Sequence, residues 1–221
     1  MSDSFYKRLL RDYSRRSRLG KFELFQSVFE PRREDRILDV GADPQLFSRF
    51  TFEDYYPFPE RITGGSIDFE MVRQARACYP QLHYAVFDGC TLPFPDKSFD
   101  IVFSNAVIEH IVGAGRQARF ARETMRVGKS WFVTTPNYWF PLEVHYLLPF
   151  FQFFPRHAQQ IYSRLSPNVA LKGNLIELAL LSARDLRRLF PTSEIAKMRV
   201  TFWPETLVAY HVDPARGPRH R

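Results

Sequence analysis

Cysteine and long apolar runs are scarce in this chain of 221 residues, and each scarcity excludes a class of protein. The two cysteines, Cys78 and Cys90, give neither a disulfide framework nor a metal-binding spacing, so a reduced compartment is expected and no metal site is predicted. The longest apolar stretch, 147–155, contains Gln152 and two prolines and is far too short to span a membrane. The N-terminus lacks the apolar segment of a signal peptide. A cytoplasmic protein without a transmembrane segment is therefore predicted.

Basic residues outnumber acidic residues by 31 to 24, which gives a net charge of +7. Much of the excess lies in a basic run from Lys7 to Lys21 and in Arg216, Arg219 and Arg221 at the other end. Terminal runs of this kind are typical of solvated faces and tails rather than of binding sites. The charge permits a nucleic-acid partner, but the sequence carries no RNA-binding module, so nucleic acid is not the expected target.

Apolar runs that end in glycine or polar residues recur along the chain and alternate with helical patterns. Strands are expected at 36–40, 62–67, 83–87, 99–105, 130–135, 194–200 and 206–212, and helices at 46–50, 68–77, 107–127 with a break at 113–115, and from Ser182. This alternation predicts an α/β fold: a Rossmann-like, doubly wound, mostly parallel sheet of seven strands with an antiparallel hairpin at its edge. The first and fourth strands should lie side by side at its centre.

Two segments fall outside this alternation, within what we expect to be a single domain. Helices at 4–15 and 20–29 precede the cofactor-binding core of 31–136 and predict an N-terminal lid over 1–30, whereas 51–60 is predicted to be a loop. The aromatic-rich insert at 137–181 has no regular period and is too long for a plain connector. It is interpreted either as the cap of a substrate pocket or as a second small core. Edge elements at 182–213 and a tail at 214–221 complete the chain.

Four motifs follow one another in a fixed order. They are ILDVGAD, ITGGSIDFEMVRQAR, FDGCTLPFPDKSFDIVFSNAVIEHI and RETMRVGKSWFVTTPN. Over residues 36–136 they resemble the class I S-adenosylmethionine-dependent methyltransferases, in the branch that modifies small molecules in bacteria. The resemblance implies S-adenosylmethionine as the cofactor and methyl transfer (EC 2.1.1.-) as the activity.

The same resemblance implies the residues that bind the cofactor. The backbone at Gly41 would meet the amino-acid end, Asp88 the adenine, and Asn105 and Ala106 the sulfonium and its methyl group. Asp39 is either a structural acid or a contact of the cofactor amine. The complete expected set is Asp39, Gly41, Ala42, Asp43, Ser66, Ile67, Asp68, Asp88, Gly89, Asn105 and Ala106.

The sequence departs from the family pattern in two places. Asp43 and Gln45 stand where the family has its second and third glycines. Ser66 occupies the place of the acid that binds the ribose, and Asp68 lies two residues further on. Asp68 is interpreted either as a substitute for that acid or as the N-cap of the following helix.

The acceptor side depends on residues after the fourth strand and in the insert. His110 is either a general base or a histidine that packs in the pocket wall, and Glu109 is interpreted as a helix-start carboxylate. Glu143 and His145 would form a second acid–base pair if the chain is locally extended. The predicted acceptor contacts are Tyr13, Tyr138, Trp139, Glu143, His145, Tyr146 and Phe150. An aromatic wall suits a planar or lipophilic acceptor.

Three functions are compatible with these patterns. The first is methylation of an oxygen or nitrogen atom of a small, aromatic or lipophilic bacterial metabolite. The second is methylation of a lipid-linked glycan or of RNA. The third is an inactive methyltransferase-like domain that binds or scaffolds, which the missing glycines motivate. The protein is expected to be a monomer or a homodimer, and the insert also suits contact with a partner or a membrane surface.

Overall fold

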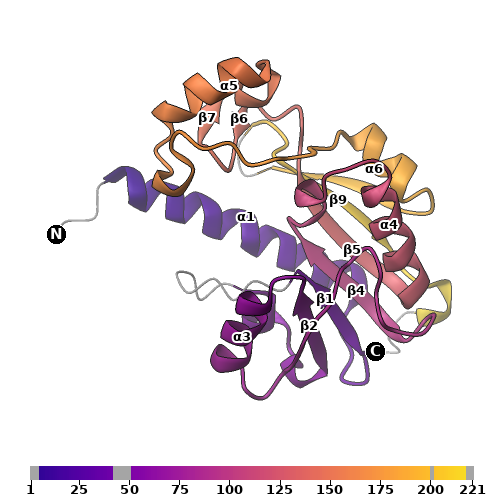
Figure 1. Cartoon of the computed structure of the whole chain (residues 1–221). Coiled ribbons are helices and arrows are strands. Elements are labelled where there is room, and N and C mark those ends of the chain that lie inside the picture. The colour runs from indigo at the N-terminus through magenta and orange to yellow at the C-terminus, as the bar shows by residue number, and fades with distance from the viewer. Residues whose placement is uncertain (1–4, 42–50, 200–201, 218–221) are drawn as a thin grey trace.

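The computed structural model of the chain describes residues 5–41, 51–199 and 202–217, and only the backbone of 5–11 and 169. A seven-stranded sheet with the order β3-β2-β1-β4-β5-β9-β8 forms its centre (Figure 1). The strands are β1 (Ile37–Val40), β2 (Ile62–Ser66), β3 (His83–Val86), β4 (Phe99–Asn105), β5 (Gly128–Pro136), β8 (Glu194–Met198) and β9 (Thr206–His211). The first five are parallel, and β9 runs antiparallel to both β5 and β8.

The predicted sheet is therefore confirmed, including the adjacency of β1 and β4, in which Ile37 pairs with Ile101. All four residues of β1 are buried because both faces of the sheet are covered. Leu38 and Val40 join one hydrophobic cluster and Ile37 joins the other, as the alternation of a strand requires.

One face of the sheet carries α4 (Arg116–Val127) and α6 (Ala183–Leu189). Ser182, from which the sequence predicted a helix, caps α6 in a capping box with Asp185. The predicted helix at 107–127 begins as a 3₁₀ turn, η2 (Ile108–His110), and α4 starts only after the predicted break.

The other face carries α1 (Phe5–Phe29), the short α2 (Phe52–Tyr55) and α3 (Phe69–Cys78). Tyr84, which packs against α3, donates a hydrogen bond to Glu53 of α2 and so places α3 on this side. The expected helix at 46–50 lies outside the described residues. The prediction of a loop at 51–60 was wrong in part, because α2 and the 3₁₀ turn η1 (Pro59–Arg61) form there.

The segment predicted to be a lid is one continuous helix, not the two that were predicted. Gly20 lies inside α1, where a Cβ atom would come within 3.3 Å of Met198 Cε, so the glycine lets the helix approach the sheet. A glycine inside a helix costs roughly 1 kcal/mol. Burial of Phe22, Phe25 and Phe29 on one stripe of the helix offsets that cost.

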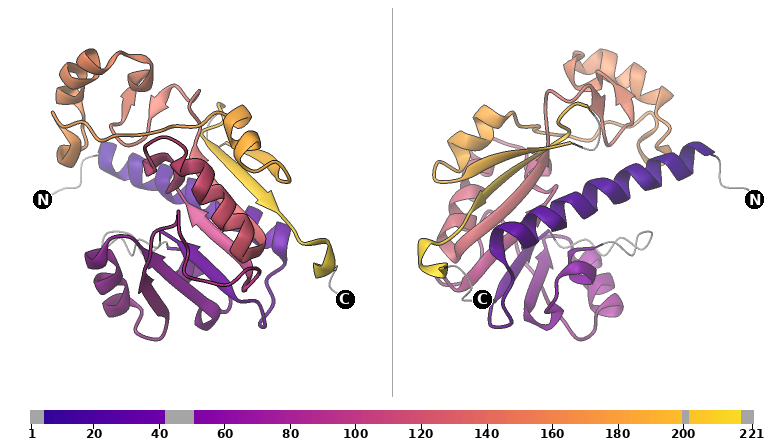
Figure 2. Two further views of the ribbon diagram at one scale, coloured as in Figure 1. Left: turned by 45° about the vertical axis from the view of Figure 1, so that its right-hand side comes forward. Right: turned by 180° about the vertical axis from the view of Figure 1, so that it is seen from behind.

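The insert folds around a small core of its own. It contains β6 (Leu142–Glu143), β7 (Leu148–Pro149), α5 (Arg156–Tyr162) and the 3₁₀ turns η3 (Phe151–Phe153), η4 (Ser163–Leu165) and η5 (Val169–Leu171), while η6 (Pro214–Arg216) lies near the chain end. Tyr146, Leu148 and Phe151 form the core. A bridge between Asn137 and Leu181 closes the insert at its base. In both views of Figure 2 it lies beyond one end of the sheet, near the N-terminal part of α1.

Of the described helices, none combines the length and the apolar character that crossing a membrane requires.

Candidate active site

Gly41 ends β1 in a backbone conformation that only glycine adopts without strain. Its φ is +87°, and a Cβ atom there would lie 2.2 Å from Val107 Cγ2. Its amide donates to the carbonyl of Gly65, which joins the ends of β1 and β2. A turn of bare backbone therefore lies where open α/β sheets bind ligands. Ala42 and Asp43, the next predicted contacts, lie outside the described residues.

Two buried acids meet below this turn. Asp39 and Glu53 are 5% and 7% exposed, and Tyr84 Oη donates to Glu53 Oε1 at 2.9 Å. Burial, followed by the charge of Glu53 and the hydrogen bond with it, raises the pKa of Asp39 well above its usual value. A cationic group brought to this pair would stabilise the ionised carboxylate.

The end of β2 carries no free carboxylate in the predicted ribose position. Ser66 is buried, and its Oγ accepts a hydrogen bond from the amide of Asp68. Asp68 Oδ1 accepts from the amides of Glu70 and Met71, so this side chain is the N-cap of α3. Ile67 is exposed beside them.

Asp88 follows β3 and is held in place from two sides. Its Oδ1 accepts from the amide of Cys90 at 2.8 Å, and its Oδ2 accepts from Arg116 Nη2 at 3.0 Å. Gly89 packs closely on Phe120 and Val40, whose atoms would lie within about 3.0 Å of an added Cβ. The Asp88 carboxylate thus has a fixed orientation and a cationic partner that the sequence did not predict.

The end of β4 is tied to the lid helix. Asn105 Oδ1 accepts hydrogen bonds from Lys21 Nζ at 3.0 Å and from Thr134 Oγ1 at 2.8 Å. Ala106 has a φ of +56°, a strained conformation for a residue with a side chain, and such strain is typical of functional sites. Burial lowers the pKa of Lys21 to about 8, although the charge of Glu109 opposes the shift. Lys21, which was assigned to a solvated basic run, therefore lies against the candidate site.

Four acid and histidine side chains meet where η2 approaches the insert. The rings of His110 and His145 are 5.0 Å apart and perpendicular, and His145 Nδ1 lies 2.7 Å from Glu143 Oε1. Glu109 is fully buried, and its Oε2 accepts from Thr135 Oγ1 at 3.0 Å. The structure thus joins the His110 region and the predicted Glu143–His145 pair, which are distant in sequence.

The charges of these groups are adjusted by their surroundings. Burial raises the pKa of Glu109 to about 7, whereas burial and the neighbouring His145 lower the pKa of His110. Burial also disfavours the charged form of His145, but the hydrogen bond and the charge of Glu143 outweigh it and raise the pKa of His145. Glu109 is therefore more than the helix-start carboxylate that the sequence indicated.

The remaining predicted acceptor contacts lie in different places. Tyr146 is 1% exposed in the core of the insert, so it supports the insert and is not an open pocket wall. Trp139 and Phe150 are more than half exposed, and Tyr138 packs edge-on against Trp139. Tyr13 of α1 donates to Glu205 Oε2, a buried carboxylate that the sequence analysis missed.

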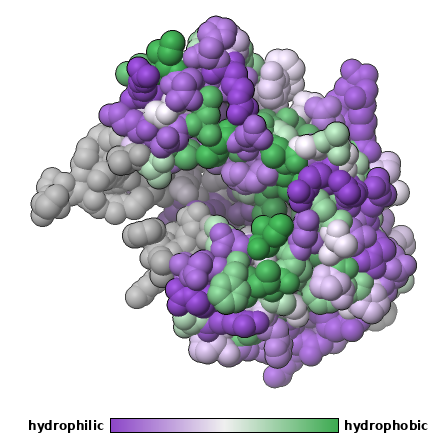
Figure 3. All heavy atoms as spheres, in the orientation of Figure 1, coloured by the Kyte–Doolittle hydropathy of each residue, from purple (hydrophilic) through white to green (hydrophobic). Residues whose placement is uncertain are grey.

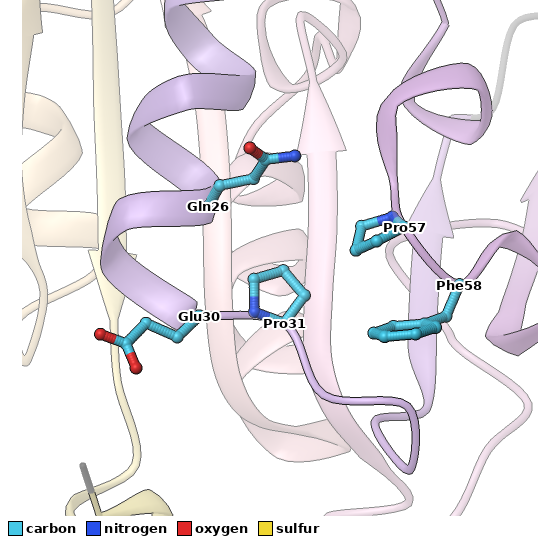
Figure 4. Close-up of a pocket in the computed structure, with 5 residues that line it drawn as sticks. All are labelled: Gln26, Glu30, Pro31, Pro57 and Phe58. Atoms are coloured by element: carbon cyan, nitrogen blue, oxygen red, sulfur yellow. The ribbon is translucent and has the colours of Figure 1, made fainter. Parts of the chain in front are cut away.

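The surface is hollowed between the insert and the rest of the molecule, and apolar side chains gather along that margin (Figure 3). A separate, shallow pocket lies at the other end of α1. It is lined by Gln26, Glu30, Pro31, Pro57 and Phe58 (Figure 4). Among the described residues, no predicted site residue lines this pocket, so it offers no support for an acceptor site there.

A seven-stranded sheet of this order, with a glycine turn after β1, a buried acid within β1 and another acid after β3, is typical of the class I methyltransferase fold. Comparison with known proteins agrees: residues 38–131 match a family model described as a methyltransferase domain. This match and the fold support a class I S-adenosylmethionine-dependent methyltransferase, and they imply S-adenosylmethionine as the cofactor.

Individual relatives are distant. The chain is 35% identical over 96 residues to 2-methyl-6-phytyl-1,4-hydroquinone methyltransferase of Synechocystis, covering 42% of this chain and 28% of that protein. It is 26% identical over 113 residues to malonyl-[acyl-carrier protein] O-methyltransferase of Pseudescherichia vulneris, covering 51% and 43%. The chain thus spans less than half the length of these relatives.

The fold also resembles the PH0226 protein of Pyrococcus horikoshii, with a TM-score of 0.60 and 16% identity over 90% of each chain. At this identity the likeness shows the fold alone.

The residues present fit the amino-acid and adenine parts of S-adenosylmethionine better than its ribose. The bare turn at Gly41 and the buried Asp39–Glu53 pair suit the amino-acid end, where the cofactor carries an ammonium group. The fixed Asp88 carboxylate suits the adenine amino group. The ribose end departs from the family, because Ser66 is the side chain that remains there once Asp68 caps α3.

Proposed function

We propose that this chain transfers the methyl group of S-adenosylmethionine to an oxygen or nitrogen atom of a small, aromatic or lipophilic acceptor. The acceptor would bind between the strand ends and the insert. The observation that carries this proposal is the meeting of His110 with His145 and Glu143, because it sets an acid–histidine cluster beside the end of β4.

Methyl transfer requires that the acceptor atom is aligned with the methyl group and that a base accepts one proton from the acceptor. S-adenosylmethionine supplies an activated methyl group, and transfer is an in-line displacement in which the sulfonium leaves as a thioether. The protein must hold the nucleophile in line, and the cluster is proposed to receive the proton that the acceptor loses. His110 is the proposed base, Asp39, Gly41, Asp88 and Asn105 the cofactor contacts, and Tyr138, Trp139 and Phe150 part of the acceptor wall.

A panel of small hydroxyl- and amine-bearing aromatic compounds with labelled S-adenosylmethionine tests the proposal. His110→Ala should lower turnover by roughly 10²–10⁴-fold and leave cofactor affinity nearly unchanged. His157→Ala, which alters an exposed histidine of α5, is the matched control and should keep wild-type turnover. Equal losses in the two variants, or a loss explained by a lower melting temperature, would contradict the assigned role.

The acceptor wall is tested separately. Phe150→Ala should raise the Michaelis constant of the acceptor more than it lowers turnover, because an apolar wall binds ground and transition states alike. An effect on turnover alone would remove Phe150 from the acceptor site.

A lipid-linked glycan is the second candidate acceptor. The observation that favours it is a group of exposed aromatic side chains on the insert, formed by Trp139, Phe150, Phe153 and Phe154. Such side chains suit an apolar chain or a membrane surface. Transfer that requires vesicles or detergent-dispersed lipid acceptors, with none to water-soluble ones, would favour this candidate.

A further inference from the structure

Three side chains with metal-binding atoms converge at the acid–histidine cluster. One ligand atom from each of Glu109, His110 and His145 lies within 4.8 Å of the other two. Ligand atoms around one zinc ion are roughly 3–4 Å apart, given bond lengths of about 2.0–2.2 Å, so modest side-chain rotation would bring these three to one ion. Elsewhere in the described part of the chain no other such set occurs.

Glu109 offers a side-chain oxygen that no described residue uses. The side chain is 0% exposed, and Oε1 finds no hydrogen-bond partner among the described residues, while Oε2 is held by Thr135. A buried carboxylate oxygen without a partner is costly unless something binds it. Lys21, whose charge acts on Glu109, donates its hydrogen bond to Asn105 instead.

His145 is oriented as a ligand by a second carboxylate. Glu143 is 3% exposed and accepts from His145 Nδ1, and its other oxygen is held by the amides of His145 and Tyr146. A carboxylate on Nδ1 fixes the tautomer in which Nε2 carries the free lone pair. This carboxylate–histidine arrangement commonly supports metal ligands in proteins.

We propose that Glu109, His110 and His145 bind one divalent transition-metal ion, with Glu143 as the positioning residue for His145. Two imidazoles and one carboxylate suit Zn²⁺ and related ions better than Mg²⁺, which prefers oxygen ligands. Three protein ligands leave a coordination position open, as in catalytic rather than structural sites.

A metal ion at this site would restrict the chemical class of the acceptor group. This part of the inference rests on the proposed function. An ion at this place would bind a hydroxyl oxygen and make its proton acidic, so the acceptor group would be an alcohol or a phenol. His110 would then act as a ligand in place of the free base proposed above, and the hydroxyl proton would pass to solvent water.

Metal binding can be measured without any acceptor. Untagged protein is stripped with a chelator and titrated with ZnCl₂ in a calorimeter, and Co²⁺ serves as a second probe through its visible absorption. One equivalent of Zn²⁺ is expected to bind. His110→Ala and His145→Ala should each weaken binding by at least 10–100-fold, and Glu143→Gln by about 10–100-fold.

Two variants guard against misfolding and unspecific binding. Glu109→Gln keeps the shape and the hydrogen bond from Thr135 but removes the charge, and it should weaken Zn²⁺ binding while far-UV circular dichroism stays unchanged. His157→Ala should bind Zn²⁺ as the wild type does. Absence of binding, or one equivalent that persists in both His110→Ala and His145→Ala, would overturn the proposal.

The metal-binding test and the methyl-transfer test can succeed or fail independently of each other. Zinc bound by these residues in a protein that methylates no hydroxyl or amine compound would reject the function and keep the metal site. Methyl transfer that survives complete removal of metal would reject the metal's role and keep the function.

Discussion

At the scale of single residues, Arg216 ties the end of the described chain to the base of the first strand. Its guanidinium meets Asp35 through Nη1 at 2.8 Å and Nη2 at 2.5 Å, and Nε donates to the carbonyl of Phe29. Both side chains of the pair are under 10% exposed. The sequence placed Arg216 in a polar tail, and the structure corrects that prediction.

Loss of this pair should be costly. Arg216→Ala is expected to lower the free energy of unfolding by about 3–5 kcal/mol, because it leaves the buried Asp35 without its cation. Arg156→Ala breaks the exposed pair with Glu177 and should cost less than about 1 kcal/mol. Urea unfolding of both variants checks the difference, and equal losses would show that the Arg216 pair is not a structural anchor.

Asp68 gives a second prediction at this scale. Its carboxylate accepts two amide hydrogen bonds at the start of α3, so Asp68→Ala should cost about 0.5–2 kcal/mol of stability. Affinity for S-adenosylmethionine should stay unchanged, as judged by calorimetry beside thermal unfolding. A marked loss of affinity without loss of stability would return Asp68 to the ribose site.

At the scale of elements, the starts of three central strands are pinned by Asp100. Lys129 Nζ of β5 donates to Asp100 Oδ1 at 2.8 Å, and the amide of Arg36, just before β1, donates to Asp100 Oδ2 at 2.9 Å. Burial raises the pKa of Asp100, but these hydrogen bonds and the neighbouring charges outweigh burial and lower it below its ordinary value.

A lowered pKa in the folded state sets the sign of a pH effect. The native state binds the proton of Asp100 less readily than the unfolded chain, so the contribution is present above the unfolded pKa and is lost as pH falls through the folded one. Asp100→Asn should therefore be less stable than the wild type near pH 7, and the gap should shrink below about pH 4. Unfolding curves at several pH values test this, and a constant gap would refute it.

The elements also show how far the sequence could predict the fold. The strands were predicted correctly because continuous apolar runs are typical of strands that are buried on both faces of a parallel sheet. The single helix α1 was predicted as two helices, at 4–15 and 20–29, because the basic stretch from Arg15 to Arg18 separates their apolar stripes. The sequence could not decide whether the insert forms a core of its own. That core depends on the packing of Leu175 and Ile176 against the cluster of Tyr146, and contacts so far apart in sequence leave no local periodicity.

The site was predictable where a motif was local. Gly41 and His110 belong to motifs of the family, but Lys21 resembled a solvated charge and Glu109 a helix start. The burial of these two residues comes from elements distant in sequence. The cluster that we propose to bind a metal ion was missed for the same reason, since His145 lies in the insert and Glu109 in η2.

At the scale of the whole molecule, α1, the sheet and the insert meet around the ends of β1 and β4. Lys21 of α1, Asn105 of β4 and the His110–His145 pair join the three parts. The central claim is that S-adenosylmethionine binds at this junction although Gly41 is the one glycine of the family turn that remains.

Calorimetric titration of the protein with S-adenosylmethionine tests that claim most directly. We expect one equivalent to bind to the wild type, and Gly41→Val to abolish binding, because φ at this position is +87° and the added side chain meets Val107. Gly217→Val, at another positive-φ glycine with open space around it, is the control and should bind as the wild type does. A wild type that gives no heat and no thermal shift at millimolar ligand would contradict the account and favour a methyltransferase-like domain without catalysis.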